Sequence, residues 1–235
     1  MSASRLPGKP LLKINGLSII THVFNKAKKT NLGRVVVCTE DKEVFTEIKK
    51  HGGEVVLTSK NHKSGSDRIY EAFKILKIEH TDLIFNLQGD EPNIDVKDLI
   101  NLHNSMTNNN SDIGTLATKV KDTSILKNEN IVKVILKEEL NDINFPHAFN
   151  FTRNYIKSKS EHVYHHIGVY IYRLSILEKF INFEQSKNEI HNRLEQMRAL
   201  DNDIKINVRL AKSTPIGVDT MEDYLALKKI MEYKS

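Results

Sequence analysis

The first half of the chain alternates short apolar stretches with segments in which apolar residues recur every three or four positions. The apolar stretches, at residues 34–39, 54–58 and 82–87, are hydrophobic at nearly every position, which is typical of strands buried on both faces. Segments such as 19–27 and 69–76 carry the one-sided pattern of helices that pack on a sheet. This order predicts βαβ units and an α/β fold with a doubly wound, mixed but mostly parallel sheet.

The second half of the chain has a more mixed pattern, which predicts a smaller mixed subdomain. The polar tract at 107–112 is typical of a loop. Neither a repeat nor a long linker interrupts the sequence, so we expect a single domain over residues 1–235. The expected strands of this half are 113–120, 131–137, 163–173 and 206–210, and the expected helices are 192–200 and 220–233.

Composition narrows the class of protein. Hydrophobic residues make up 39% of the chain and charged residues 28%, which indicates a folded, globular protein. No run of 18 apolar residues is present to span a membrane, and the first five residues lack the apolar core of a secretory signal. The single cysteine, Cys38, excludes an internal disulfide and a multi-cysteine zinc site. A cytoplasmic protein is the simplest interpretation.

The net charge of +5 does not indicate a nucleic-acid-binding protein. Of the 35 basic residues, 27 are lysines scattered along the chain and only 8 are arginines, whereas a phosphate-reading surface favours clustered arginine. The mild positive charge still favours the approach of an anionic substrate.

The segment at residues 5–11 is suited to binding a polyphosphate. Two prolines stiffen it, Gly8 allows the backbone to approach a ligand closely, and Arg5 and Lys9 flank it with positive charge. The alternative is a solvated basic terminus. The sequence has neither a GxxxxGK[ST] loop nor a GxGxxG loop, so the usual signatures of NTPases and dinucleotide-binding proteins are absent.

Two aspartates are candidate ligands for a hard cation such as Mg²⁺. Asp90 follows a strongly apolar strand, and ligands of open α/β sheets bind beyond the carboxyl ends of strands. Asp219 precedes the last expected helix. The alternatives are an acidic turn around Asp90 and, for Asp219, a helix N-cap.

Other polar segments allow both a functional and a structural interpretation. The small-residue loop at 64–68 leads into a helix N-terminus, which favours anions, but Ser66 is also a plausible N-cap. His166 follows a second histidine at the start of a strand, without a partner at metal-ligand spacing. On the helix expected at 192–200, Glu195 and Arg198 are spaced to form a surface ion pair.

Taken in order, eight segments resemble the 3-deoxy-manno-octulosonate (KDO) cytidylyltransferases, also called CMP-KDO synthetases. Each motif is weak alone, but together they span nearly the whole chain in the order of that family. The segments are RLPGKPL at 5–11, ING at 14–16, GGEVVLT at 52–58, HKSGSDR at 62–68, NLQGDEP at 86–92, HIGVYIYR at 166–173, LEQMRAL at 194–200 and IGVDTMEDY at 216–224.

The resemblance implies a nucleotidyltransferase-like fold, a homodimer and a Mg²⁺-dependent reaction. In that reaction CMP passes from CTP to the anomeric hydroxyl of KDO and pyrophosphate leaves, as a step in lipopolysaccharide synthesis. Residues 1–112 would form the nucleotide-binding half and residues 113–235 the half for sugar binding and dimerisation.

The resemblance also implies roles for individual residues. Arg5 and Lys9 would grip the triphosphate, Lys9 as part of the catalytic set, and Asp90 and Asp219 would be the catalytic metal ligands. The remaining residues would contact the nucleotide (Ser64, Gly65, Ser66 and Arg68) or line the sugar pocket (Gln88, His166, Tyr170, Glu195 and Gln196).

Two departures from the family pattern change the expectations. Relatives begin with a strand resembling IIIPAR before the polyphosphate loop, so we expect that this first strand is missing and that coding sequence lies upstream of Met1. Relatives also carry Ser and Arg where this chain has Pro146 and His147. Because histidine offers fewer donors than arginine, the alternatives are a related acidic sugar, an amino-octulosonate or a nonulosonate, or a nucleotide-binding relative without turnover.

Overall fold

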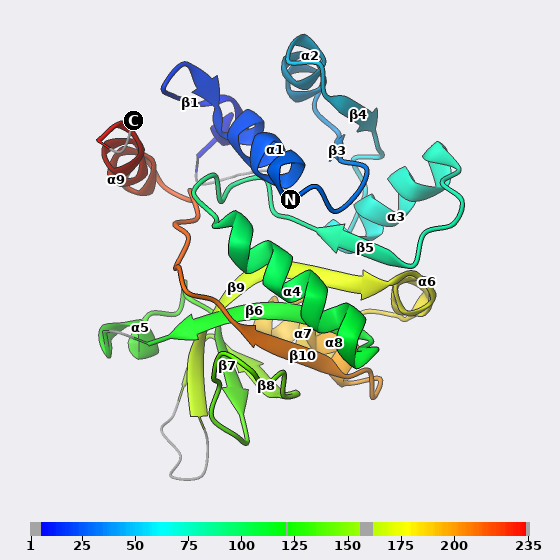
Figure 1. Cartoon of the computed structure of the whole chain (residues 1–235), viewed down its shortest axis with the longest axis vertical. Helices are drawn as coiled ribbons and strands as arrows, with labels where there is room; N and C mark the ends of the chain where they lie inside the picture. Colours follow the sequence, from blue (N-terminus) through cyan, green and yellow to red (C-terminus); the bar gives the residue numbers. More distant parts are fainter. Residues whose placement is uncertain (1–5, 121, 156–161, 234–235) are drawn as a thin grey trace. The chain divides into compact units, whose positions relative to one another are not determined.

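The computed structural model describes residues 6–120, 122–155 and 162–233. The chain forms two compact units (Figure 1). The first contains residues 1–79, 87–100 and 215–235, and the second contains residues 80–86 and 101–214. The C-terminal segment thus returns to the unit of the N-terminal segment, whereas the resemblance implied two halves that meet at residue 112.

The first unit surrounds a parallel pair of strands, β3 (Val36–Thr39) and β4 (Glu54–Leu57). Helix α2 (Lys42–Lys50) connects them, as the βαβ pattern predicts. The other elements of this unit are the 3₁₀ turn η1 (Lys9–Leu11), the hairpin of β1 (Lys13–Ile14) and β2 (Leu17–Ser18), and the helices α1 (Ile19–Thr30), α3 (Gly65–Leu76) and α9 (Met221–Glu232).

Two apolar clusters hold the first unit together. In one, Ile20 and Phe24 of α1 pack with Val44 and Ile48 of α2 and with Val55 of β4. The one-sided apolar pattern of each helix produces this packing, because all four helical residues lie on the buried face.

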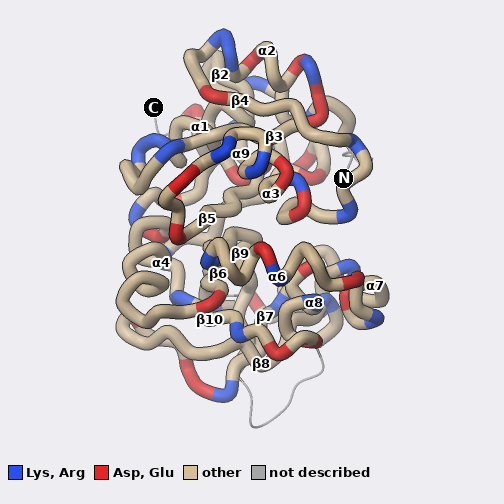
Figure 2. The backbone as a smooth tube through the Cα atoms, turned by 90° about the vertical axis from the view of Figure 1, so that its right-hand side faces the viewer, with Lys and Arg blue, Asp and Glu red and all other residues tan. Residues whose placement is uncertain are grey.

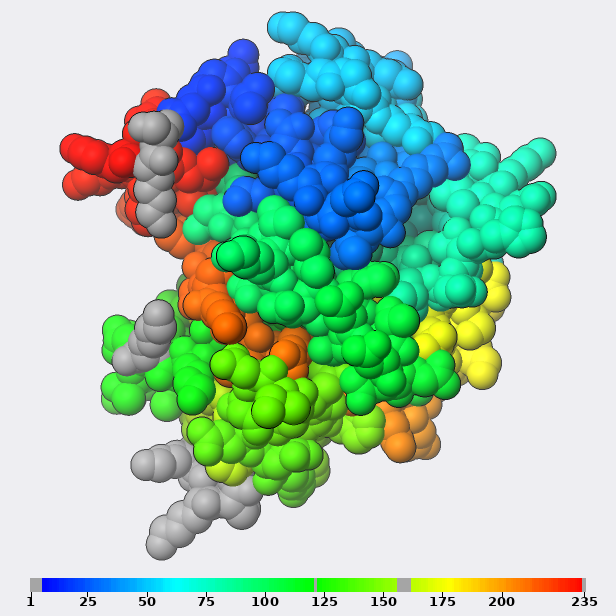
Figure 3. Space-filling view, viewed as in Figure 1, coloured from blue at the N-terminus to red at the C-terminus, as the bar shows by residue number. Residues whose placement is uncertain are grey.

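The second cluster joins the two ends of the described chain. Leu6, Ile14 and Ile19 pack with Val218 and with Leu227 of α9. Figures 1 and 3 show the blue N-terminal segment beside the red C-terminal helix. This packing places residue 9 and residue 219 in the same unit despite a separation of 210 positions.

The second unit is built on a six-stranded mixed sheet with the order β10-β6-β9-β7-β8, in which β5 also pairs with β9. Because β9 is antiparallel to β5, β6 and β7, and β10 is parallel to β6, four of the six strands run in one direction. The strands are β5 (Leu83–Asn86), β6 (Ile113–Lys119), β7 (Lys133–Leu136), β8 (Ala148–Thr152), β9 (His162–Arg173) and β10 (Ile206–Leu210).

Four short helices complete the second unit: α5 (Ser124–Lys127), α6 (Leu174–Asn182), α7 (Lys187–Asn192) and α8 (Met197–Leu200). Helix α4 (Val96–Asn109) begins in the first unit and continues in the second. No helix in the described ranges is both long enough and apolar enough to cross a bilayer.

The α/β class with a mixed sheet is confirmed, and the expected strands lie within two residues of the observed ones. Three local predictions were wrong. Helix α4 extends to Asn109 into the tract assigned to a loop, and the helix expected at 192–200 is two short helices separated by a turn. The N-cap of α3 is Ser64, whose hydroxyl accepts a hydrogen bond from the Asp67 amide, rather than Ser66.

Candidate active site

Three side chains predicted for phosphate and metal binding meet in the first unit. The Nζ atom of Lys9 lies 2.6 Å from Oδ2 of Asp90 and 3.1 Å from Oδ1 of Asp219. The Lys9 side chain is 15% exposed, and those of Asp90 and Asp219 are 26% and 46% exposed. Three residues spread over 210 positions of sequence therefore form one half-buried ionic cluster.

The backbone explains why these side chains converge. The Val218 amide donates a hydrogen bond to the carbonyl of Asp90 at 3.0 Å, and the Ile216 amide donates to Oδ1 of Asn93 at 2.9 Å. These two bonds tie the segment before α9 to the turn after β5. Asp90 and Asp219 flank this attachment, so their carboxylates reach the same ammonium.

Gly8 and Gly89 shape the backbone on either side of the cluster. Gly8 adopts a left-handed conformation with φ of 71°, which starts η1 and which other residues adopt only at a cost. A Cβ at residue 89 would lie 2.9 Å from Cδ1 of Ile20, so a larger residue in the turn before Asp90 would require the end of the Ile20 side chain to shift.

Asp219 is not the N-cap of α9, the structural alternative considered from the sequence. Thr220 caps this helix in a capping box, in which its hydroxyl accepts from the Asp223 amide and the Asp223 carboxylate accepts from the Thr220 amide. The Asp219 side chain instead extends to Lys9.

The cluster changes the ionisation of its neighbours. Burial lowers the pKa of Lys9, but the charges and hydrogen bonds of Asp90 and Asp219 outweigh it and raise the pKa overall, so the side chain stays an ammonium. Burial, assisted by the Asp90 charge, raises the pKa of Glu91 to about 8. Its Oε2 atom is buried and has no hydrogen-bond partner. The sequence interpretation did not single out Glu91, although it lies in the same motif as Asp90.

The donor set fits Mg²⁺ held jointly by protein and substrate. Within the described ranges, no group of three or more histidine, cysteine, aspartate or glutamate side chains is arranged to hold a metal, which does not suit a structural zinc site. Mg²⁺ is typically held by one or two carboxylates together with substrate phosphates. Asp90 and Asp219 supply such a pair of carboxylates.

The predicted nucleotide-binding residues at 64–68 lie at the start of α3. The Arg68 guanidinium contacts the Glu40 carboxylate, and its Nη1 donates a hydrogen bond to Oγ1 of Thr58 at 2.7 Å. Glu40 and Thr58 directly follow the carboxyl ends of β3 and β4, the edge where parallel α/β sheets bind ligands. Arg68 therefore braces this edge through contacts within the unit.

Four of the predicted sugar-pocket residues lie in the second unit. On β9, the rings of His166 and Tyr170 are 5.5 Å apart. Burial is the main cause that raises the pKa of Tyr170, and the charges of Tyr172 and Glu195 add to it, so Glu195 lies within electrostatic range of this phenol. Gln196 is buried at the N-cap of α8.

The structure does not place the remaining predicted residues in the Lys9–Asp90–Asp219 cluster. Gln88 is exposed in the first unit, and Arg5 lies outside the described residues. Arg198 is not part of a surface pair: it is 2% exposed and makes a bidentate ion pair with Glu189 at 2.6 and 2.8 Å.

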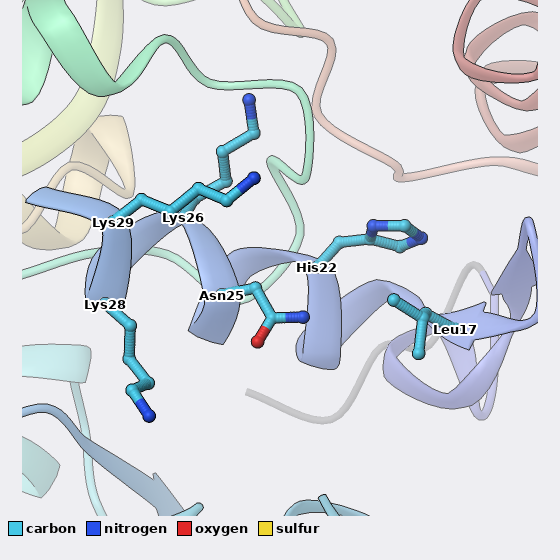
Figure 4. A pocket seen from close by; sticks show the side chains of 6 residues that line it. All are labelled: Leu17, His22, Asn25, Lys26, Lys28 and Lys29. Carbon is cyan, nitrogen blue, oxygen red and sulfur yellow. The ribbon is translucent and has the colours of Figure 1, made fainter. Parts of the chain in front are cut away.

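Basic residues in the described ranges are mixed with acidic ones. Figure 2 shows lysines and arginines interspersed with acidic residues along the backbone. A pocket along β2 and α1 is lined by Leu17, His22, Asn25, Lys26, Lys28 and Lys29. Figure 4 shows that the Lys28 side chain points away from those of Lys26 and Lys29. The pocket includes none of the predicted site residues.

Comparisons with known proteins identify the family of this chain. The family model described as cytidylyltransferase matches residues 1–206. The 3-deoxy-manno-octulosonate cytidylyltransferase of Bartonella tribocorum is 38% identical over 232 residues, covering 98% of this chain and 95% of the relative. The enzyme of the same name from Afipia carboxidovorans is 40% identical over 232 residues, covering 98% and 93%.

Solved structures show the same likeness. A structure of CMP:2-keto-3-deoxy-manno-octonic acid synthetase complexed with CTP matches with a TM-score of 0.86 and 30% identity, covering 99% of this chain and 95% of that one. An apo UDP-glucose pyrophosphorylase matches with a TM-score of 0.75 at 12% identity, covering 100% and 96%, which shows a shared fold alone. By sequence and by structure, this chain belongs to the 3-deoxy-manno-octulosonate cytidylyltransferase family.

Proposed function

We propose that this protein transfers CMP from CTP to the anomeric hydroxyl of KDO, releasing pyrophosphate, as a step in lipopolysaccharide synthesis. The observation that carries the proposal is the meeting of Lys9, Asp90 and Asp219 in a chain of this family. In the reaction the sugar oxygen forms a bond to the α-phosphorus of CTP, the bond from that phosphorus to the bridging oxygen breaks so that pyrophosphate leaves, and the hydroxyl proton passes to the solvent.

The charge of the cluster supports the proposal that the reaction needs a divalent cation. One ammonium beside two carboxylates leaves one unit of negative charge, which would repel a triphosphate. Asp90 and Asp219 would hold Mg²⁺, which when bound neutralises the phosphates and orients the α-phosphorus for in-line attack.

Lys9 and the second-unit residues have separate tasks. The carboxylates of Asp90 and Asp219 hold the ammonium of Lys9 in place. Lys9 would donate hydrogen bonds to phosphate oxygens. His166, Tyr170, Glu195 and Gln196 would bind the hydroxyls of the sugar and exclude water. Because positioning and charge stabilisation dominate phosphoryl transfer, these tasks suffice without a covalent intermediate.

The direct test measures pyrophosphate release from CTP with KDO and Mg²⁺. We expect turnover by the wild-type chain, loss of turnover when EDTA removes divalent ions, and recovery when Mg²⁺ is restored. Asp90→Asn should lower kcat/KM by a factor of about 100 or more, because one metal ligand is lost. Asp203→Asn is the matched control, since residue 203 is exposed and has a positive φ that asparagine tolerates.

Two results would contradict the proposal: no pyrophosphate release with any acidic sugar, or normal turnover by Asp90→Asn at limiting Mg²⁺. CTP binding by calorimetry without release would support the alternative of a nucleotide-binding protein without turnover.

The acidic sugar has a specific alternative. Pro146 is buried and its carbonyl accepts a hydrogen bond from the Val208 amide at 2.8 Å, whereas His147 is exposed. The position at which relatives carry arginine therefore offers no buried cation here. Comparison of kcat/KM for KDO, an amino-octulosonate and a nonulosonate decides between these substrates.

We also propose that the protein forms a homodimer and acts in the cytoplasm. Light scattering should give a mass twice the 27.0 kDa of one chain. A cytoplasmic enzyme has direct access to CTP.

A further inference from the structure

A buried threonine in the second unit contacts one of the proposed sugar-pocket residues. Thr115 of β6 is fully buried, and its Oγ1 lies 3.0 Å from Nε2 of His166. The same oxygen lies 2.7 Å from the carbonyl oxygen of Val169 and 3.3 Å from that of Ile167. One hydroxyl thus lies within hydrogen-bonding distance of an imidazole and two backbone carbonyls.

These contacts lie at an irregularity of the sheet. Thr115 pairs with Tyr170, but the next residue, Leu116, pairs with Ile167. Strand β9 therefore advances three residues where β6 advances one, so Gly168 and Val169 form a bulge. Bulges bend a strand and redirect its side chains, and His166 and Tyr170 lie on either side of this one.

The single proton of the Thr115 hydroxyl determines the tautomer of His166. Two carbonyl oxygens crowd Oγ1, and carbonyls only accept hydrogen bonds. If the proton pointed to the imidazole, the hydroxyl oxygen would face the Val169 oxygen at 2.7 Å without a hydrogen between them. The hydroxyl therefore donates to Val169 and accepts from Nε2–H of His166.

The second ring nitrogen is then the acceptor. Burial, with a smaller contribution from the charge of His165, lowers the pKa of His166 to about 3, so the ring is neutral at physiological pH. A neutral ring that carries its proton on Nε2 has an unprotonated Nδ1. The edge of the Phe151 ring, 5.1 Å away at 81°, further restricts the imidazole plane.

We propose that Thr115 is a positioning residue that locks the β9 bulge and holds His166 as the Nε2–H tautomer, so that Nδ1 accepts a hydrogen bond from a hydroxyl of the acidic sugar. This inference rests on the proposed function for the sugar, but the tautomer and the bulge do not depend on it. Thr115 acts through His166 and does not itself contact substrate.

A pair of variants separates the hydroxyl from the shape of the side chain. Thr115→Val removes the hydroxyl at nearly equal volume, and Thr115→Ser keeps it. We expect Thr115→Val to raise the KM for the sugar about tenfold, the order expected for one lost hydrogen bond. The KM for CTP should stay within about twofold, and Thr115→Ser should restore most of the sugar affinity.

The tautomer is measured on the wild-type chain by the ¹⁵N shifts of its histidine rings, with the His166 signals assigned by their loss in His166→Gln. We expect a protonated Nε2 and an unprotonated Nδ1. A protonated Nδ1 would overturn the proposal, and so would a Thr115→Val variant with unchanged KM for the sugar or with equal losses for both substrates.

The spectroscopic result also separates two kinds of failure. If the wild-type chain does not turn over KDO, the proposed function fails while an Nε2–H tautomer still supports the role of Thr115. If Thr115→Val does not fold, the ring shifts of the wild type and of Thr115→Ser decide the question.

Discussion

At the scale of single residues, Lys9 shows how context decides the role of a common residue type. It is one of 27 lysines, and the amino-acid composition alone does not distinguish it from the solvated lysines. In the structure it contacts two carboxylates from distant segments, and their charges raise its pKa despite the opposing effect of burial. A lysine held in this way loses less side-chain entropy when a phosphate binds.

Replacement of Lys9 by alanine tests this role. We expect Lys9→Ala to raise the KM for CTP at least tenfold, because an ammonium is lost and two adjacent carboxylates are left uncompensated. Lys13→Ala, at an exposed residue near the same turn, is the matched control and should retain the wild-type KM. An equal KM for CTP in the two variants would contradict this role and show that Lys9 acts as an ordinary solvated lysine.

At the scale of elements, the connection from α2 to β4 shows how a Gly-Gly pair ends a helix. The Gly52 amide donates to Lys49 and the Gly53 amide donates to Ile48, which is the Schellman arrangement. Gly52 has φ of 68°, with no atom near its missing Cβ. At Gly53, a Cβ would lie 2.5 Å from Cγ2 of Ile48 and 3.1 Å from its carbonyl oxygen.

The two glycines therefore have different costs of substitution. Gly52→Ala should lower the free energy of unfolding by about 1 kcal/mol, the cost of a left-handed backbone. Gly53→Ala should lower it by about 2–3 kcal/mol, because the new methyl group meets a fully buried residue of the core. Urea unfolding followed by circular dichroism measures both, with Lys50→Ala as an exposed control; a larger loss for Gly52→Ala would contradict this account.

At the scale of the whole molecule, buried titratable groups determine how stability varies with pH. The pKa of His166 is about 3 in the folded chain and about 6.5 in an unfolded one. Between these values the unfolded state binds a proton that the folded state does not, so stability falls as the pH falls. Above pH 6.5 both states are neutral at this residue, and its contribution is constant.

Replacement of His166 should change this dependence. Urea unfolding of the wild-type chain at pH 4.5–6.5 should include a slope of up to about 1.4 kcal/mol per pH unit from this one histidine. His166→Gln should lose that slope while its absolute stability also falls. If the stability of His166→Gln varied with pH as steeply as that of the wild type, the prediction would be wrong. The His166 imidazole would then take up its proton in the folded state as well.

Much of the fold and part of the site followed from local patterns. Apolar runs and helical spacing depend on neighbours in sequence, so β3–β7, β9, β10, α1, α2, α3 and α9 were predictable, whereas β1, β2 and β8 were not predicted. The turn between α7 and α8 was not, because the apolar spacing continues through it while a left-handed Arg193 ends α7. The polar end of α4 was also missed, because its sequence is that of a loop.

The sequence alone indicated an α/β fold with Lys9, Asp90 and Asp219 as candidates for phosphate and metal binding, because strand and helix periodicity and short motifs are local properties. The nucleotidyltransferase activity followed only from the resemblance of those motifs to a known family. They did not show that one ammonium joins both aspartates, that Arg68 is bound to Glu40, or that Thr115 holds His166. Each of these contacts joins segments that are far apart in sequence, and long-range packing and hydrogen bonds alone bring such segments within bonding distance.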